Sequence, residues 1–455
     1  MTLLKNIRQN SSIKLITIIF ITITMLIPLS MVENTIRERS GLRLDAISSI
    51  AQRWGGEQII SAPVLAVPYS EKIIETPAPV NGWIPPENTH QKKKITYIHH
   101  MAYLLADNTS ISTKMDTEVR YTGIYKVPVY TTKTAIKGHF IKQDLENLNQ
   151  RYKNLNWSQA KLLLPISDAR NIKSISSVKF ARSDIDFVPP SLAYCFNSIE
   201  AAVDLSDIVN SDLDFSLTIS HAGSSQINFL PLSRISDITL KSDWSSPGFN
   251  GAYLPLRRTI SDTGFTSKWR ILGLNRSFGQ MWHDNNINNV NFENSQFGAS
   301  LYQPADIYQQ NIRSVKYAAL FIALTFMVFF LFEIFFNLNI HPIQYFFNGG
   351  AISTFYLLLL ALSEHLHFSI AYLISSIAIV TLMSGYSMTI LKQKSRGILI
   401  GVITAIIYSF LYFIIQSEQN SLLFGAIGFF SALSTIMYLT RNIDWYNVKP
   451  ASKLE

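Results

Sequence analysis

Six long apolar stretches constrain the fold of this 455-residue chain more than any other feature of its sequence. An α-helix needs about 20 apolar residues to cross a bilayer, and a helix satisfies its own backbone polar groups in lipid. The composition agrees, since only 15% of the residues are charged and soluble domains carry about 25%. We predict a polytopic α-helical membrane protein with spans at Leu15–Val32, Tyr317–Phe336, Tyr345–Leu362, Phe368–Leu391, Gly397–Ile415 and Leu422–Leu439.

The first span stands apart from the other five. It follows Lys5, Arg8 and Lys14, as a signal sequence or a signal anchor does. It ends in a poor site for signal peptidase, so a retained anchor is favoured over a cleaved peptide. The last five spans are joined by short connections, which make neighbouring helices antiparallel. The predicted arrangement is one anchor helix followed by a five-helix bundle.

Lys and Arg in the short connections predict the orientation of the spans, because cytoplasmic loops carry an excess of both. Lys392, Lys394 and Arg396 lie together in one connection. The alternate connections contain no Lys or Arg and carry Glu364 and Glu418. Both termini are therefore predicted to be cytoplasmic, and the region between the first and second spans is predicted to be periplasmic.

The region from residue 37 to residue 313 has a different pattern. After a predicted helix at Arg37–Arg53, apolar and polar residues alternate with period two, which is typical of strands that bury one face. The clearest segments are Ile95–Leu105, Glu118–Tyr130, Asp214–Ser220 and Ile227–Leu232. The last two are predicted to form a hairpin that folds back between residues 221 and 226. We predict a large, mostly antiparallel β domain.

Four parts of the chain follow from these patterns. Residues 1–36 form the cytoplasmic N-terminus and anchor, 37–313 the periplasmic β-rich domain, 314–446 the five-helix transmembrane bundle, and 447–455 a cytoplasmic tail. Lys and Arg exceed Asp and Glu in residues 72–182, and the reverse holds in residues 183–312. This charge asymmetry has three explanations: two subdomains, two faces that meet, or ordinary solvated surface.

Several kinds of function have no support in the sequence. The net charge is +8, but the only basic run, Lys92-Lys93-Lys94, is too short for a nucleic-acid patch. A single cysteine, Cys195, excludes an intramolecular disulfide and Cys-based zinc or redox motifs. Walker, HExxH, GxSxG and kinase-type motifs are absent. We expect a non-enzymatic protein without a cofactor, whose partners are the bilayer and other envelope proteins or lipids.

Glu333 is the main candidate functional residue, because an ionisable side chain inside an apolar span is costly unless it has a role. It lies near the predicted cytoplasmic end of its span and could reach the interface, so an interfacial anchor or a helix-packing contact is favoured over a functional role. Glu364, His365 and His367 crowd one outer connection. Glu-His-x-His could titrate or bind zinc, but a fourth ligand is missing and no metal is predicted.

The remaining candidates lie at or near helix ends. Arg441 and Asp444 follow the last span beside aromatic residues, as an interfacial anchor does. Gly397 and Gly401 have the GxxxG spacing that permits close helix packing.

Several segments carry a resemblance to a known family. In the spans they are Lys316–Phe326, His341–Tyr345, Phe355–His365 and Thr440–Tyr446, and in the β-rich region Ala62–Tyr69, Gly123–Tyr125, Asp168–Arg170 and Tyr253–Pro255. Through them the chain resembles the CreD family of bacterial inner-membrane proteins, also called cell envelope integrity inner membrane proteins. The resemblance covers nearly the whole chain and is weakest over residues 76–94. His341 is a further candidate because it begins one of these motifs.

The resemblance implies more about location than about mechanism. Similar proteins are tied to envelope stress, colicin tolerance and control by a sensor-kinase system. We therefore expect an inner-membrane protein that contributes to cell envelope integrity. The alternative is a transporter or a lipid-handling protein that uses the helix bundle. A polar cavity among the helices would favour transport, and an apolar groove open to the bilayer would favour lipid handling.

Overall fold

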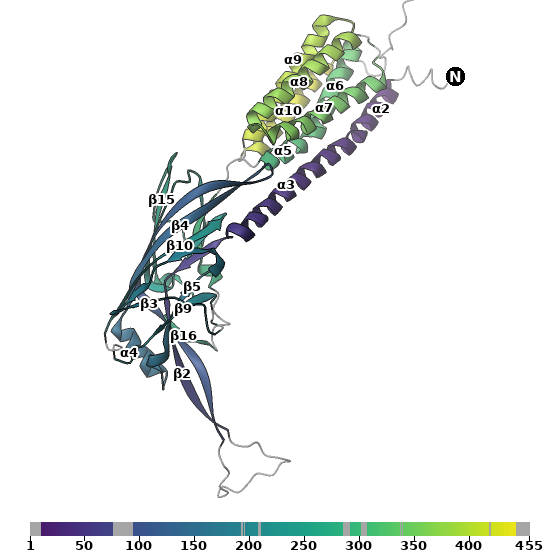
Figure 1. Ribbon diagram of the computed structural model, residues 1–455. Helices are drawn as coiled ribbons and strands as arrows, with labels where there is room; N and C mark the ends of the chain where they lie inside the picture. The colour runs from purple at the N-terminus through teal and green to yellow at the C-terminus, as the bar shows by residue number, and fades with distance from the viewer. Residues whose placement is uncertain are drawn as a thin grey trace, which may run out of the picture. The chain divides into compact units, whose positions relative to one another are not determined.

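The computed structural model divides the chain into two compact units, Met1–Leu44 with Ala305–Glu455, and Asp45–Pro304 (Figure 1). We call them the membrane unit and the sheet unit. The structure describes residues 11–75, 94–192, 194, 196–207, 211–284, 292–301, 307–336, 338, 340–417 and 420–442.

The membrane unit is helical. In the described ranges, six helical segments are long and apolar enough to cross a membrane, which agrees with the prediction. The first is made of α2 (Ser11–Thr24) and α3 (Leu26–Trp54). The other five are α6 (Ala318–Phe335), α7 (Pro342–Ser363), α8 (Phe368–Ile390), α9 (Lys394–Gln416) and α10 (Ser421–Thr440).

The anchor helix and the helix predicted at Arg37–Arg53 are one helical segment, from Ile13 to Trp54. Its only irregularity in this range is at Met25, between α2 and α3. Pro28 sits in the first turn of α3, where a missing backbone N–H breaks no helical hydrogen bond. The polar residues after the span therefore continue the helix.

The structure adds a short helix that the sequence analysis missed, α5 (Ile307–Lys316). Tyr308, Asn311 and Val315 are buried, and their spacing of three and four residues puts them on one face. α5 is too short and too polar to be a span, and it leads directly into α6.

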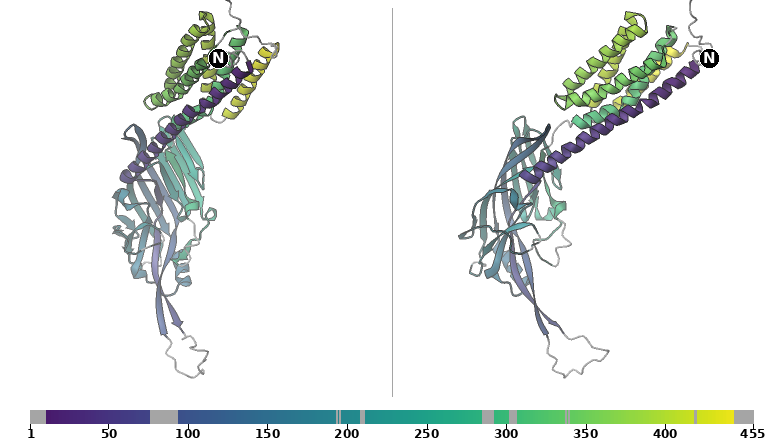
Figure 2. Two further views of the ribbon diagram at one scale, coloured as in Figure 1. Left: turned by 90° about the vertical axis from the view of Figure 1, so that its right-hand side faces the viewer. Right: turned by 45° about the vertical axis from the view of Figure 1, so that its right-hand side comes forward.

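α8 and α9 lie side by side, as two further views show (Figure 2). A Cβ atom added at Gly397 would lie 2.6 Å from the backbone nitrogen of Met388, and one at Gly401 would lie 2.8 Å from Ser384 Oγ. Only glycine fits at these positions. The close helix packing predicted from the Gly397/Gly401 spacing is confirmed.

Within its described residues, the sheet unit contains a thirteen-stranded and a four-stranded sheet. The strands of the larger sheet are β2 (Val64–Glu75), β3 (Lys94–Thr122), β4 (Tyr125–Phe140), β5 (Ala160–Pro165), β6 (Ile172–Ile175), β7 (Val178–Phe180), β8 (Ser183–Ile185), β9 (Ser198–Val203), β10 (Leu213–Ser224), β12 (Ser233–Ser242), β14 (Arg257–Ser261), β15 (Gly264–Leu272) and β16 (Met281–His283). The smaller sheet has β1 (Gln58–Ser61), β11 (Gln226–Leu230), β17 (Phe297–Leu301) and β13 (Pro247–Gly251). One helix, α4 (Lys142–Arg151), follows β4.

The long strand β3 connects two parts of the larger sheet. Its first half pairs with β2 and β16, and its second half pairs with β4 and β12. Most pairs are antiparallel, as predicted; β12 with β3 and β1 with β11 are parallel.

Two details of the predicted strands are wrong. Glu118–Tyr130 is not one strand, because the chain turns at Gly123 and Ile124, and Thr122 pairs with Tyr125. Gly123 has φ +59, a conformation that favours glycine.

The predicted hairpin between Asp214–Ser220 and Ile227–Leu232 is also wrong. The chain does turn at Ser225, but β10 pairs with β4, β6 and β7, and β11 enters the smaller sheet between β1 and β17. The period-two pattern identified both segments as strands but did not specify their partners.

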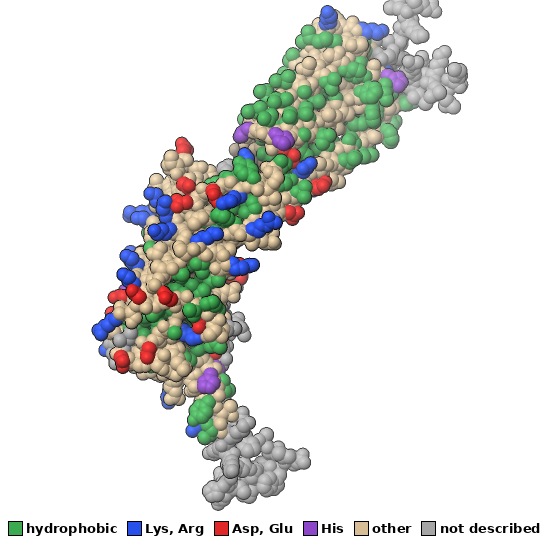
Figure 3. Space-filling model, in the orientation of Figure 1, with side chains coloured by type: hydrophobic (Ala, Val, Ile, Leu, Met, Phe, Trp, Pro, Cys, Tyr) green, Lys and Arg blue, Asp and Glu red, His purple; other side chains and the backbone are tan. Residues whose placement is uncertain are grey.

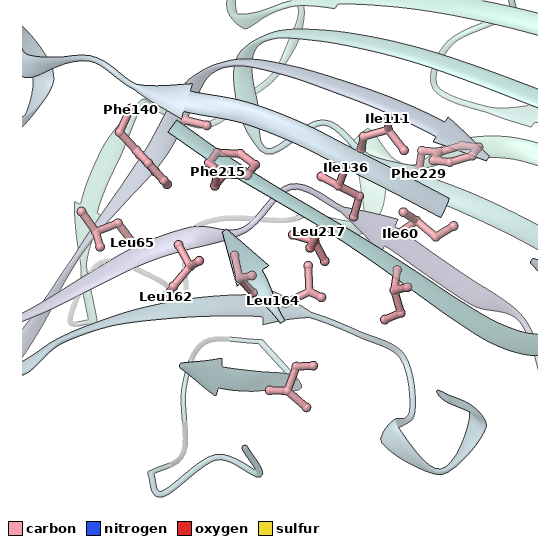
Figure 4. Packing of buried hydrophobic residues seen from close by; sticks show 14 of the residues in the cluster. Ile60, Leu65, Ile111, Ile136, Phe140, Leu162, Leu164, Phe215, Leu217 and Phe229 are labelled. Atoms are coloured by element: carbon pink, nitrogen blue, oxygen red, sulfur yellow. The ribbon is translucent and has the colours of Figure 1, made fainter. Parts of the chain in front are cut away.

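The core of the sheet unit lies where the two parts of the larger sheet face one another (Figure 4). Phe215 and Leu217 of β10 and Ile136 of β4 meet Leu162 and Leu164 of β5, and all five are nearly fully buried. This core gives the sheet unit its own source of stability, since burying apolar area stabilises by about 25 cal/mol per Å².

Candidate functional site

Glu333, the charge inside an apolar span, is buried in a polar cluster at the end of α6. Its carboxylate forms an ion pair with Lys14 of α2. Its Oε1 accepts a hydrogen bond from the backbone N–H of Ile340 (3.3 Å), and its Oε2 accepts one from the hydroxyl of Tyr345 (3.2 Å). Three donors from three chain segments therefore compensate the burial of this charge.

Glu364 forms a second polar cluster, at the end of α7. Its Oε1 accepts a hydrogen bond from the hydroxyl of Tyr308 on α5 (3.2 Å) and lies 3.8 Å from Nε of Arg39 on α3. Next to it, Asn311 donates a hydrogen bond to Oγ of Ser363 (2.9 Å). Both predicted carboxylates therefore join the first helical segment to later helices, Glu333 through α2 and Glu364 through α3.

The other predicted residues are not brought into these clusters. His341 caps α7, where its Nδ1 accepts a hydrogen bond from the N–H of Ile343 (3.2 Å). His365 is exposed in the connection between α7 and α8. Arg441 ends α10 with its guanidinium 4.1 Å from the ring centre of Tyr438. Asp444 lies outside the described residues. His, Cys, Asp and Glu form no group of three able to hold a metal ion within the described ranges.

The sheet unit holds a partly buried ion pair that the sequence analysis missed. Lys161 of β5 donates to Glu200 of β9 (3.0 Å) and to Ser191 (2.5 Å), and the hydroxyl of Tyr194 also donates to Glu200. Burial alone would raise the pKa of Glu200, but the hydrogen bonds from Tyr194 and Lys161 outweigh it and lower this pKa to about 2.

The contact between Ser191 and Lys161 resembles the serine–lysine pair of some hydrolases, in which a neutral lysine takes the proton of the serine. Burial would lower the pKa of Lys161, but hydrogen bonds with Tyr194 and Glu200 reverse this and raise it. A raised pKa does not favour the neutral lysine that such a pair needs. Lys161 and Glu200 instead tie β5 to β9 across the sheet.

The sheet unit has another polar cluster at the rim of its core, around His100 of β3, Tyr69 of β2 and the end of β16. Nδ1 of His100 is 3.1 Å from Oδ1 of Asp284, and Nδ1 of His283 is 3.8 Å from the same oxygen. Tyr69 packs against both His100 and Tyr152, with ring centres 5.3 and 5.0 Å apart. Burial and the charge of Asp284 raise the pKa of Tyr69 to about 12. Sequence spacing could not have found this cluster, because Tyr69 and Asp284 meet only through the pairing of β2 and β16 with β3.

A cavity of about 290 Å³ lies among α6, α9 and α10. Its lining is almost entirely apolar and includes Leu324 of α6, Phe410 of α9 and Ala432 of α10. α10 has no buried residue, whereas α6, α7, α8 and α9 each have several. The cavity therefore has the character of a lipid-facing groove rather than of a polar passage.

These features define a class of protein: a multi-span membrane protein with a large sheet-rich domain between its first and second spans. The family model described as "Inner membrane protein CreD" matches residues 10–446. The chain belongs to the CreD family of inner membrane proteins. This agrees with the family resemblance read from the sequence.

Two further comparisons are with individual proteins. The Inner membrane protein CreD of Escherichia coli (strain K12) is 29% identical over 425 residues, which cover 93% of this chain and 91% of that protein. Among solved structures, an M1 zinc metallopeptidase from Deinococcus radiodurans is 7% identical, with 37% of this chain and 38% of that chain covered and a TM-score of 0.17. So low a TM-score carries no argument about fold or activity.

Proposed function

We propose that this protein contributes to cell envelope integrity and to tolerance of envelope stress or colicins, as the family resemblance implies. In this proposal the sheet unit lies in the periplasm and carries the specific function. The membrane unit holds it, with both termini in the cytoplasm. The protein acts without catalysis.

One observation supports this division of roles: the two candidate carboxylates, Glu333 and Glu364, join helices to one another. Glu333 is bonded to Lys14 and Tyr345, and Glu364 to Tyr308. Carboxylates that serve transport usually face a water-filled path. The sheet unit, by contrast, has its own core and a large exposed surface.

A chimera tests this proposal. Residues 45–304 are fused at both ends to unrelated membrane helices and expressed in a deletion strain, with insertion checked by protease protection. Rescue of envelope-stress and colicin tolerance supports the proposal. A folded, inserted chimera that rescues neither phenotype would show that the helices themselves are active.

The apolar cavity favours a second candidate function, the handling of a lipid chain by the bundle. Ala432→Trp would fill the cavity from α10, and Leu433→Trp places the same side chain on α10 at a residue that does not line it. If the bundle handles lipid, only Ala432→Trp abolishes rescue and removes co-purifying lipid. Equal rescue by both variants contradicts lipid handling.

A further inference from the structure

The exposed face of the larger sheet carries lysines that the strand register places side by side. Lys241 of β12 pairs with Lys114 of β3, and Lys114 pairs with Lys133 of β4. All three side chains are exposed. Three neighbouring strands therefore present like charges in one row.

A second row lies four residues along β4. Lys137 pairs with Ser110 on one side and with Ser216 on the other, and Ser216 pairs in turn with Lys179 of β7. Lys137, Ser110 and Ser216 line an open depression of about 380 Å³, together with Asp214. Within the row, lysines alternate with serine hydroxyls, which are groups that bind phosphate oxygens. At its two ends, Asp237 of β12 lies opposite Ser110 and Asp184 of β8 lies opposite Lys179.

Acidic side chains neutralise this face only in part. Lys114 is 2.8 Å from Asp116, and Arg270 of β15 is 3.6 Å from Asp237. In the described part of the chain, Lys133, Lys137 and Lys241 form no ion pair. Figure 3 shows Lys and Arg side chains over β4 and β15, with Asp and Glu side chains among them. We call Lys114, Lys133, Lys137, Lys179 and Lys241 the basic face.

The arrangement has a cost. Like charges directly opposite one another in a sheet are destabilising, and an exposed sheet face is ordinarily dotted with both signs. Removing a lysine row would relieve the repulsion without disturbing the core, because these side chains point away from it. A face that keeps such a row is suited to a partner that supplies the missing negative charge.

We propose that the basic face docks on a bilayer surface rich in anionic, phosphate-bearing lipid headgroups. The face is broad, extends over several strands and has only a shallow, open depression, so it fits a planar array of charges better than a narrow ligand. Membrane spans flank the sheet unit on both sides in the sequence, and tethering raises the local concentration of a bilayer surface. Each Lys close to an anionic bilayer strengthens binding about fivefold.

The test uses the full-length protein in nanodiscs of phosphatidylcholine. These are mixed with vesicles of phosphatidylcholine, or with vesicles that also contain phosphatidylglycerol, and binding is measured by co-flotation. We expect binding only to the anionic vesicles, and weakening by salt. Replacing Lys133, Lys137 and Lys241 by Glu should weaken it about a hundredfold.

A matched control makes the same change of net charge elsewhere on the sheet unit. It replaces Lys142, Arg151 and Lys153, on and just after α4, by Glu. A Lys→Gln version of the basic-face variant, with thermal unfolding measured, separates lost binding from lost folding. Equal weakening by the control, or unchanged binding in the basic-face variants, overturns the proposal. The proposal is also overturned if the protein binds soluble polyphosphate but does not bind anionic vesicles. None of these outcomes depends on rescue by the chimera, so the two proposals fail separately.

Discussion

At the scale of single residues, Glu333 is the side chain whose replacement has the clearest expected effect. Glu333→Leu removes the carboxylate that pairs with the Lys14 ammonium and accepts a hydrogen bond from the Tyr345 hydroxyl. We expect a loss of about 1–3 kcal/mol in the stability of the membrane unit, as for other polar groups left unsatisfied. Glu333→Gln keeps an acceptor oxygen and should lose less. Thermal unfolding in detergent measures both.

Two controls show whether the ion pair causes this loss. Glu38→Leu removes an exposed carboxylate from α3 and should change little. Lys14→Met combined with Glu333→Leu removes both charges, so its loss should be smaller than the sum of the two single losses. Additive losses would show that Glu333 and Lys14 act independently. If Glu333→Leu fully rescues a deletion strain, the polar cluster around Glu333 has only a structural role.

His221 gives the sheet unit an acid-sensitive stability. Burial lowers its pKa to about 4, whereas an unfolded histidine has a pKa of about 6.5. Between these values the unfolded chain binds the proton more readily than the folded one. Stability should therefore fall as the pH drops from about 6.5 to about 4 and should not fall further for this reason below that range. The measurement compares the melting temperature of wild type and His221→Gln across this range.

The difference in melting temperature should shift in favour of His221→Gln as the pH falls. His99→Gln changes an exposed position of the same unit. Its melting temperature should differ from that of wild type by a nearly constant amount across this pH range. A pH profile of His221→Gln parallel to that of wild type would mean that His221 does not contribute the acid sensitivity.

The sequence could reveal Glu333 but not its cluster. A lone carboxylate in an apolar span is conspicuous because lipid has no water to solvate it. Its partner Lys14 is 319 residues away in the chain, and nothing in either segment points to the other. The same limit hid Glu200 and Lys161, which meet only because β5 pairs with β9.

At the scale of elements, the turn at Gly123 and Ile124 decides how β3 and β4 pair. A Cβ added at Gly123 meets nothing within 4 Å, so a substitution there tests the backbone conformation alone. At φ +59 alanine should cost about 1 kcal/mol. Asparagine, which tolerates this conformation, should cost less.

Chemical unfolding of Gly123→Ala and Gly123→Asn measures whether alanine costs more stability than asparagine. Gly56→Ala is the matched control, because that position also has free space and no positive φ. A larger loss for Gly56→Ala than for Gly123→Ala would contradict the assigned turn.

Helices and strands differ in how far their arrangement could be predicted. Lipid forces each apolar stretch into a helix, so the six spans follow from hydropathy. A strand instead needs a partner, and period two identifies the buried face but not that partner. Residues 227–232 read correctly as a strand, yet this strand pairs with β1 and β17, which come from far earlier and later in the chain. The α5 helix was missed because it is short and its buried face includes polar Asn311.

At the scale of the whole molecule, the proposed orientation places the sheet unit outside the cytoplasm. The connection between α8 and α9 and the start of α9 carry Lys392, Lys394 and Arg396, whereas the connection from α7 to α8 carries Glu364. Antiparallel helices put these two connections on opposite sides of the membrane. Positive charge marks the cytoplasmic side.

Labelling of introduced cysteines tests the orientation. Cys195 is the single cysteine, so Cys195→Ser gives a background without thiols. In that background, Lys153→Cys and Lys394→Cys each introduce one exposed thiol, the first just after α4 and outside the basic face, the second at the start of α9. A membrane-impermeant maleimide should label position 153 in spheroplasts and position 394 only after lysis, because the intact bilayer shields the cytoplasmic side. Labelling of position 394 in intact spheroplasts, or protection of position 153, would reverse the orientation and with it the periplasmic placement of the sheet unit.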